Sequence, residues 1–250
     1  MPEIDPARKK RLEESFIKHA ALAELYRWCQ GPEHGPYALN SYTLDVMPGG
    51  RIALTAELDG YQDGALPGGA TRRTPIYCTA ELTPLDGTLP RIARIETSQG
   101  TGGQTGLFEA PGTRNRLLSL VHYFTSLVEN PARDPAPFRE VLTDDFALHY
   151  VEPPVSTHAM LDEWVTGRLA SVVASNHRIH EMSFEIADND EYAVTVAMES
   201  EALFPDGSGI ISKNRQSWRV IDNAAERFAR IREVRIERDD MRRFDLPEAD

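Results

Sequence analysis

The strongest constraint on the fold is a pattern of alternating apolar and polar residues that occurs twice along the chain. A run that begins at Leu39 aligns without a gap with a run that begins 140 positions later, at Ile179. The coinciding pairs are Leu44 with Phe184, Val46 with Ile186, Ile52 with Tyr192, Leu54 with Val194, and Thr55 with Thr195. Alternation with a period of two is typical of strands that bury one face. The sequence therefore predicts two related antiparallel sheets that arose by internal duplication.

The first half of the chain predicts one helix followed by a meander of strands. Apolar residues recur at helical spacing over 12–30, after Asp5 and Pro6, which favour a helix start. The Gly- and Pro-rich stretch 31–36 ends this helix. Strand-like runs then cover 39–47, 51–60, 74–83 and 91–98.

The second half predicts the same meander preceded by additional elements. It gives helices over 114–129 and 137–142, a short strand over 146–151, a helix over 158–173, and long strands over 178–187, 191–203, 212–221 and 229–237. The additional elements lie within 131–177, where the first half has only 31–38. Residues 99–113 are rich in Gly but lack both phosphate-loop spacings, so they indicate a linker.

Composition excludes several classes of protein. The net charge is −12 over 250 residues and the longest basic run is Arg8 to Arg11, so no electrostatic footprint for nucleic acid is present. No run approaches the roughly 18 apolar residues of a membrane span, and the first residues lack an apolar signal core, so we expect a cytoplasmic protein. Cys29 and Cys78 form no metal or disulfide motif and are expected to be buried.

Three segments of the second half resemble one known superfamily. They are "LVHYFTSLVEN", "FREVLTDDFALHYVEPP" and "NRQSWRVID". Their order resembles that of the nuclear transport factor 2-like, ketosteroid isomerase and SnoaL-like proteins. The resemblance implies an α+β fold in which a curved antiparallel sheet and its helices form a cone around an apolar pocket.

The resemblance and the repeat together predict two tandem cone-shaped domains. The expected boundaries are 1–98 for a reduced first copy, 99–113 for a linker, 114–238 for a complete copy, and 239–250 for an acidic C-terminal tail. Members of the superfamily commonly dimerise through the outer sheet face. The resemblance therefore implies that the first copy serves as an internal pseudo-dimer partner, with homo-oligomers as a further option.

Glu152, in "YVEPP", is the first candidate for a catalytic residue. The resemblance places it where isomerase-like members keep a proton-shuttling carboxylate, and a carboxylate at the mouth of an apolar pocket has its pKa raised by desolvation. The alternative is an exposed residue at a strand end. On the same face of the short strand, Tyr150 is expected to contact substrate.

The first helix of the complete copy offers an aromatic donor. Tyr123 and Phe124 both lie near the position of the family's oxyanion-stabilising Tyr, and the sequence leaves open which of them faces the pocket. On the strand "NRQSWRV", Gln216 and Trp218 share one face and are expected to contact substrate. Trp164 is expected to pack over the pocket mouth or in the core.

The histidines predict no metal site. His177 and His180 are three residues apart on a strand and therefore point to opposite faces. By resemblance to dehydratase-like members, which use a His and Asp pair, His149 or His180 is a candidate dyad base. We thus expect His149 among catalytic residues and His180 among those that contact substrate.

These observations leave two functions open. One is a cofactor-free isomerase, cyclase or dehydratase that moves a proton on an apolar, carbonyl-bearing small molecule. The other is a non-catalytic module for ligand binding or protein assembly. No cofactor, metal, nucleic acid or membrane partner is expected in either case.

Overall fold

The computed structural model describes residues 6–30, 37–62, 72–85, 87–100, 104–105, 111–187 and 191–245. It divides into two compact units, which we treat separately. The first-sheet unit comprises Ile17–Tyr123, and the second-sheet unit comprises Met1–Phe16 together with Phe124–Asp250. The boundaries fall inside two long helices, α1 (Pro6–Trp28) and α2 (Pro111–Glu129). This division differs from the predicted domains 1–98 and 114–238, which assigned each helix whole to one copy.

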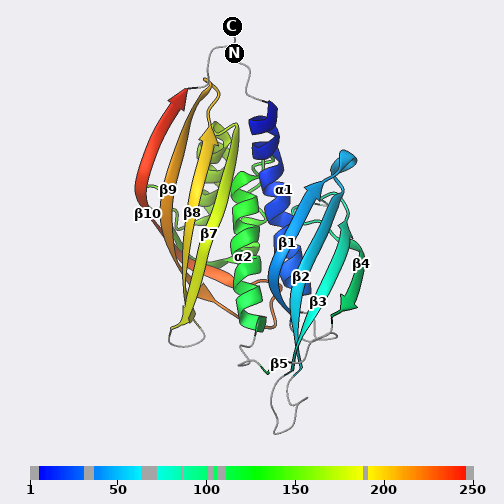
Figure 1. Ribbon diagram of the computed structural model, residues 1–250. Coiled ribbons are helices and arrows are strands. Elements are labelled where there is room, and N and C mark those ends of the chain that lie inside the picture. Colours follow the sequence, from blue (N-terminus) through cyan, green and yellow to red (C-terminus); the bar gives the residue numbers. More distant parts are fainter. Residues whose placement is uncertain are drawn as a thin grey trace. The chain divides into compact units, whose positions relative to one another are not determined.

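The first-sheet unit is built on a four-stranded antiparallel meander (Figure 1). Its strands are β1 (Tyr37–Val46), β2 (Ile52–Gln62), β3 (Arg72–Leu82) and β4 (Ile92–Gln99), with the short β5 (Gln104–Thr105) paired to β3 and a 3₁₀ turn η1 (Pro48–Gly50) between β1 and β2. Alternate residues of β2 and β3 form a buried core with Ala21 and Leu25 of α1 and with Cys29, which follows this helix. Cys29 and Cys78 are both buried, as predicted.

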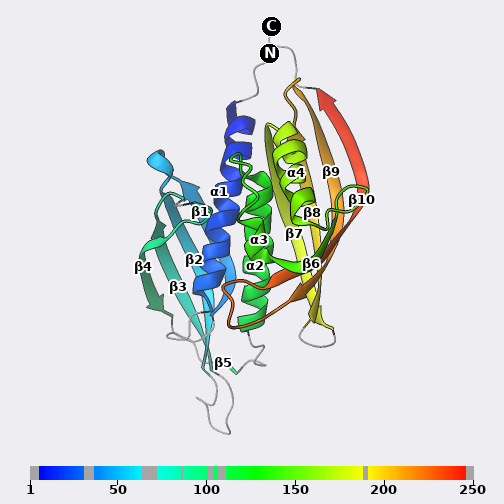
Figure 2. The same ribbon diagram turned by 180° about the vertical axis from the view of Figure 1, so that it is seen from behind.

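The second-sheet unit has a mixed sheet of longer, curved strands (Figures 1 and 2). In chain order its elements are α3 (Phe138–Val141), β6 (Leu142–His149), α4 (His158–Glu163), a π-helical turn η3 (Trp164–Arg168), a 3₁₀ turn η4 (Leu169–Ser171), β7 (Ala174–Ile186), β8 (Glu191–Leu203), β9 (Ser208–Ile221) and β10 (Arg230–Asp245). The strand order is β6-β10-β9-β8-β7, with β6 parallel to β10 and the rest antiparallel. Figure 2 shows α4 on one face of this sheet. The α+β class and the curved antiparallel sheet are confirmed.

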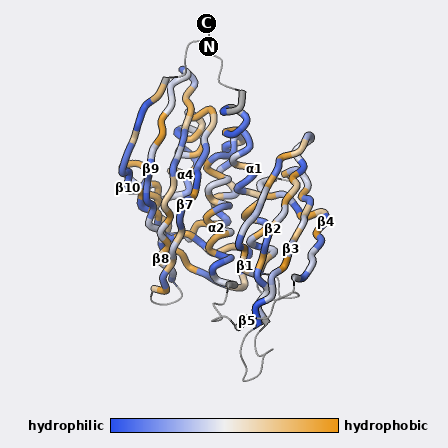
Figure 3. Tube along the Cα trace, in the orientation of Figure 1, coloured by the Kyte–Doolittle hydropathy of each residue, from blue (hydrophilic) through white to orange (hydrophobic). Residues whose placement is uncertain are grey.

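Hydropathy alternates along the strands of both units, as the sequence pattern predicted (Figure 3). From Ser212 to Val220 of β9 the buried residues are Ser212, Asn214, Gln216, Trp218 and Val220, and the residues between them are exposed. Several of the buried residues are polar. The inner face of this sheet therefore needs internal hydrogen-bond partners.

The two sheets share details of pairing at equivalent positions. Leu44 pairs with Leu54 and, 140 positions later, Phe184 pairs with Val194. The register of β1 shifts between Leu39 and Ser41, and that of β7 shifts between Ile179 and Glu181, again 140 positions later. The irregular pairing of β4 around Ala93 corresponds to that of β10 around Arg232. Bulges are features that are retained within families, so these coincidences support the proposal of an internal duplication.

Two predicted boundaries in the second half are wrong. Residues 239–245 are not a tail, because β10 continues to Asp245 and pairs with β9 along its length. The predicted short strand over 146–151 begins at Leu142 and ends at His149, so Glu152 follows the strand rather than ending it. The isolated bridge between Leu148 and Val155 closes the loop that holds Glu152. Residues 246–250 lie outside the described part of the chain.

None of the helices in the described ranges is both long enough and apolar enough to span a bilayer.

Candidate functional site

A chain of stacked aromatic rings fills the interior of the second-sheet unit. The ring of Tyr150 stacks with that of Trp164, at 5.5 Å and 22° between planes, and with that of Phe124, at 6.5 Å and 18°. Phe124 in turn meets Trp218 edge to face at 5.3 Å. Phe138 contacts both Phe124 and Trp164 in the same edge-to-face manner. Such pairs add to the hydrophobic gain of burying the rings, so the predicted apolar pocket is largely occupied by its own side chains.

Gln216 provides the polar centre of this interior. Its Oε1 accepts hydrogen bonds from the Trp218 indole Nε1–H at 3.0 Å and from the Tyr150 hydroxyl at 3.2 Å. Its amide nitrogen donates to Asn214 Oδ1 at 3.3 Å, and Asn214 donates to Ser200 Oγ at 2.9 Å. Gln216 is only 4% exposed. A buried amide that engages both of its ends is held in one orientation.

A buried carboxylate and a histidine form a pair beside this centre. Glu129, the last residue of α2, accepts hydrogen bonds at Oε1 from the backbone N–H of His177 at 2.5 Å and from His177 Nδ1 at 2.9 Å. The Glu129 side chain is 1% exposed and that of His177 is 18% exposed. Donation from Nδ1 to a carboxylate fixes the tautomer in which Nε2 is the proton acceptor.

His177, Tyr150 and Gln216 line a single inner void. The void has a volume of about 20 Å³ and is lined by Phe124, Thr125, Val128, Tyr150, His177, Met198, Gln216 and Trp218. A space of this size holds about one water molecule. The surrounding atoms also desolvate the Tyr150 hydroxyl, and this burial raises the pKa of Tyr150 well above its usual value.

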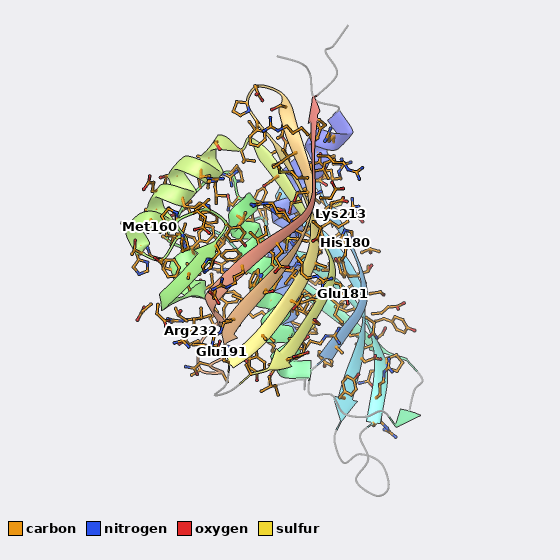
Figure 4. All side chains as sticks on the ribbon, turned by 90° about the vertical axis from the view of Figure 1, so that its left-hand side faces the viewer. Met160, His180, Glu181, Glu191, Lys213 and Arg232 are labelled. Carbon is orange, nitrogen blue, oxygen red and sulfur yellow. The ribbon has the colours of Figure 1, made fainter. Side chains whose placement is uncertain are left out.

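A larger outer cleft lies on the other side of Trp164. It measures about 380 Å³ and runs between one face of α4 and η3 (Met160, Glu163, Trp164, Gly167, Arg168) and the loop after β6 (Val151, Glu152, Pro153, Val155). Met160 is labelled on α4 in Figure 4. Trp164 and Val155 are buried, whereas Glu152, Glu163 and Arg168 are exposed. The outer cleft thus has apolar residues at its base and charges at its rim.

The first-sheet unit carries a hollow of about 280 Å³ on its sheet, lined mainly by threonine and charged side chains such as Thr43, Thr79 and Glu81. Arg94 and Glu96, on its edge, form an ion pair with each other. The sequence singled out no residue here.

Glu152 lies in the outer cleft and does not line the inner void. Its side chain is exposed, because β6 ends three residues earlier and the Leu148–Val155 bridge turns the loop outward. The desolvated carboxylate expected at this position is therefore not what the structure holds there. Glu152 as a base stays a prediction without support from burial.

The choice between Tyr123 and Phe124 is settled by their contacts. Phe124 packs in the interior of the second-sheet unit, whereas the Tyr123 hydroxyl shares a hydrogen bond of 2.8 Å with Thr88 Oγ1 in the first-sheet unit. Successive helix residues point about 100° apart, so one helix cannot direct both rings to the same place. Tyr123 is not part of the inner void.

His149 and His180 also lie away from the inner void. His149 Nε2 pairs with Glu233 Oε1 at 3.1 Å across β6 and β10. His180 is exposed and falls at the β7 bulge, on the face that Figure 4 turns toward the viewer together with Glu181 and Lys213. Of the predicted contact residues, Phe124, Tyr150, Gln216 and Trp218 meet at the inner void, and Trp164 lies on the far side of Tyr150.

The His177–Glu129 pair was missed by reasoning from sequence. The two residues are 48 positions apart and belong to a helix and a strand whose contact no local pattern encodes. One signal was present: His177 and His180 were expected on opposite faces, and one of those faces had to be the inner one.

Comparisons with known proteins concern the fold alone. No protein-family model and no curated protein matches this chain. Solved structures do match it. In fold the chain is similar to nuclear transport factor 2-like proteins. One such protein from Salmonella enterica serovar Typhimurium is 8% identical, with a TM-score of 0.45 over 52% of this chain and 93% of the other.

Two further structures match over a comparable extent. A hexachlorocyclohexane dehydrochlorinase is 10% identical, with a TM-score of 0.46 over 55% of this chain and 93% of its own. The Kfla4162 protein from Kribbella flavida is 14% identical, with a TM-score of 0.47 over 54% of this chain and 95% of its own. Each of these matches covers little more than half of this chain.

Proposed function

We propose that the second-sheet unit binds a small, largely apolar molecule that carries a carbonyl or hydroxyl group, and that it transfers a proton on this molecule without a cofactor. The observation that carries the proposal is the inner void, which brings together a histidine held by a buried carboxylate, a tyrosine hydroxyl and a fixed amide. These are the groups that general acid–base catalysis requires.

Each group has a role in this proposal. His177 takes the proton at Nε2, and Glu129 stabilises the imidazolium that forms, because a buried carboxylate interacts strongly with a charge at 2.9 Å. The Tyr150 hydroxyl lies next to the same void, where it donates to the amide oxygen of Gln216. His177 thereby replaces Glu152 as the proposed base.

The outer cleft supplies the room that the inner void lacks. Ligand pockets typically measure about 300 to 1,000 Å³, and the outer cleft, at about 380 Å³, falls within this range. We therefore place ligand entry there, with Glu152, Glu163 and Arg168 at the rim. No ion pair or hydrogen bond joins any of these three side chains to another described residue.

A non-catalytic ligand-binding or assembly module is the second candidate. The observation that favours it is the occupied interior, with an inner void of about 20 Å³ and an exposed Glu152. In this case a ligand binds in the outer cleft and no proton is transferred.

Proton exchange on a bound ketone separates the two candidates. Aromatic ketones that raise the melting temperature of the protein are incubated with it in D₂O, and NMR follows deuterium incorporation next to the carbonyl. We expect incorporation with the wild-type protein and a loss of at least tenfold in His177→Gln with binding retained.

Glu152→Gln is the control for this experiment. It alters the exposed rim and is expected to keep the exchange rate within about twofold, since the base is His177. Exchange that disappears in Glu152→Gln and persists in His177→Gln would return the catalytic role to Glu152. Binding without exchange in the wild-type protein would establish the non-catalytic candidate.

A further inference from the structure

We infer that the phenol ring of Tyr150 occupies the binding place of a ligand ring, and that the ligand is a hydroxylated aromatic molecule that displaces it. The inference rests on the proposed function and narrows its ligand class. It follows from three features around Tyr150: the two rings stacked on it, the acceptor at its hydroxyl, and its position next to the outer cleft.

Two neighbouring aromatic rings define the slot that Tyr150 fills. The rings of Trp164 and Phe124 both stack on the Tyr150 ring, and each is within 22° of parallel to it. Offset stacking of this kind suits a planar aromatic ring. A flat aromatic ligand can take over both contacts, whereas an aliphatic group would lose the stacking.

The end of the slot selects a hydrogen-bond donor. The indole N–H of Trp218 can only donate, so Gln216 must turn its oxygen toward Trp218, and Tyr150 meets this same oxygen. The amide nitrogen is directed to Asn214 and Met198 instead. A ligand hydroxyl can replace the Tyr150 hydroxyl here, whereas an ether or ketone oxygen would face another oxygen. A ring bearing a hydroxyl is therefore favoured over one bearing only acceptors.

The position of Tyr150 allows its side chain to rotate out of the interior. It is the first residue after β6, it is half-buried, and the next residue, Val151, already lines the outer cleft. Rotation of this side chain into the cleft would open the slot without breaking a pair of the sheet. The opened slot would then lie between the outer cleft, which Trp164 lines, and the inner void, which His177 and Gln216 line.

Removing the phenol ring provides a test that does not depend on catalysis. Tyr150→Ala should lower the melting temperature, and p-cresol, which reproduces the lost side chain, should restore part of the loss, as small molecules do in engineered cavities. Toluene, which lacks the hydroxyl, and 4-methylanisole, which cannot donate a hydrogen bond, serve as comparison compounds. We expect p-cresol to bind at least tenfold more tightly than either of them.

Tyr77→Ala is the matched control, since Tyr77 is 52% exposed on the first-sheet unit and borders neither the inner void nor the outer cleft. None of the three compounds should stabilise it selectively. Equal effects of all three compounds on Tyr150→Ala, or no effect of any, would overturn the inference.

The wild-type protein tests displacement directly and covers the case in which Tyr150→Ala does not fold. 2-Naphthol should quench tryptophan fluorescence on binding, and it should associate at least tenfold faster with Tyr150→Leu, in which no phenol has to leave. Failure of wild-type protein and Tyr150→Leu to bind 2-naphthol rejects the slot. Deuterium exchange on ketones is measured separately. If the slot prefers hydrogen-bond donors but no exchange occurs, only the proposed proton transfer is rejected. If exchange occurs but the slot does not prefer donors, only this inference is rejected.

Discussion

At the scale of single residues, the first-sheet unit buries a pair of histidines. The Nδ1 atoms of His19 and His122 are 2.8 Å apart, and Tyr26 stacks on His122 at 5.6 Å. One ring must donate and the other accept, so the accepting ring is neutral. Burial, and then the proximity of His19, holds the pKa of His122 well below its usual value of 6.5.

This pair predicts that acid destabilises the protein. The folded state keeps His122 neutral, whereas the unfolded chain binds a proton as the pH falls below about 6.5, so the unfolded state gains protons and stability decreases. The loss approaches about 1.4 kcal/mol per pH unit. Denaturant unfolding at pH 7.5 and 5.5 should show it, and His122→Gln should flatten the dependence. His180→Gln, at an exposed site, is the control and should leave the slope unchanged.

At the scale of elements, close packing where β9 begins and β10 ends requires a glycine at position 209. Gly209 pairs with Phe244, whose ring covers the glycine and also lies under the guanidinium of Arg8 at 3.8 Å. Leu12 and Leu203 form the small core that Phe244 packs against. A Cβ at Gly209 would lie 2.1 Å from the Phe244 ring.

Gly209→Ala should therefore destabilise the protein. The ring must leave both Arg8 and the small core, and overpacking of this kind costs about 1 to 3 kcal/mol. Gly167→Ala is the matched control, because a Cβ there meets open space and glycine is unfavourable within a helix, so we expect no loss of stability. Chemical denaturation measures both. Equal stabilities of the two variants would show that Phe244 adapts freely.

At the scale of the whole molecule, the predicted repeats and the folded units do not coincide. Within the first-sheet unit, α2 donates from Asn115 to the carbonyl of Tyr37 at 2.7 Å and from Ser119 to the carbonyl of Ala23 at 2.8 Å. Asn115 and Ser119 lie beyond the predicted domain boundary at residue 98. The first-sheet unit is therefore incomplete in a chain that ends before α2.

A fragment of residues 1–98 should consequently fail to fold. It lacks the part of α2 that contributes buried Leu117, Leu120 and Val121 to this unit, and small domains with reduced cores are marginal. We expect a broad thermal transition by circular dichroism and poor dispersion of its amide NMR signals. A sharp, cooperative transition would instead support 1–98 as an independent domain.

Much of the fold followed from local pattern. Period-two alternation located nearly all strands, since a strand with one buried face must alternate. Local pattern did not predict where the strands end. The strand β10 runs to Asp245 because β9 pairs with it, whereas the charged residues of this segment show no alternation that would indicate pairing. The residues of the candidate site were likewise only partly predictable from local pattern. Gln216 and Trp218 were found from their shared face, whereas Glu129 and His177 meet only through packing.

The sequence by itself determined which residues face inward, because alternation and helical spacing act over a few neighbouring positions. Only the tertiary structure decided what those residues do together. It moved Glu152 to an exposed loop, directed Tyr123 to Thr88, and joined His177 to Glu129. Contacts between residues far apart in the chain depend on how elements pack, and no local pattern records that.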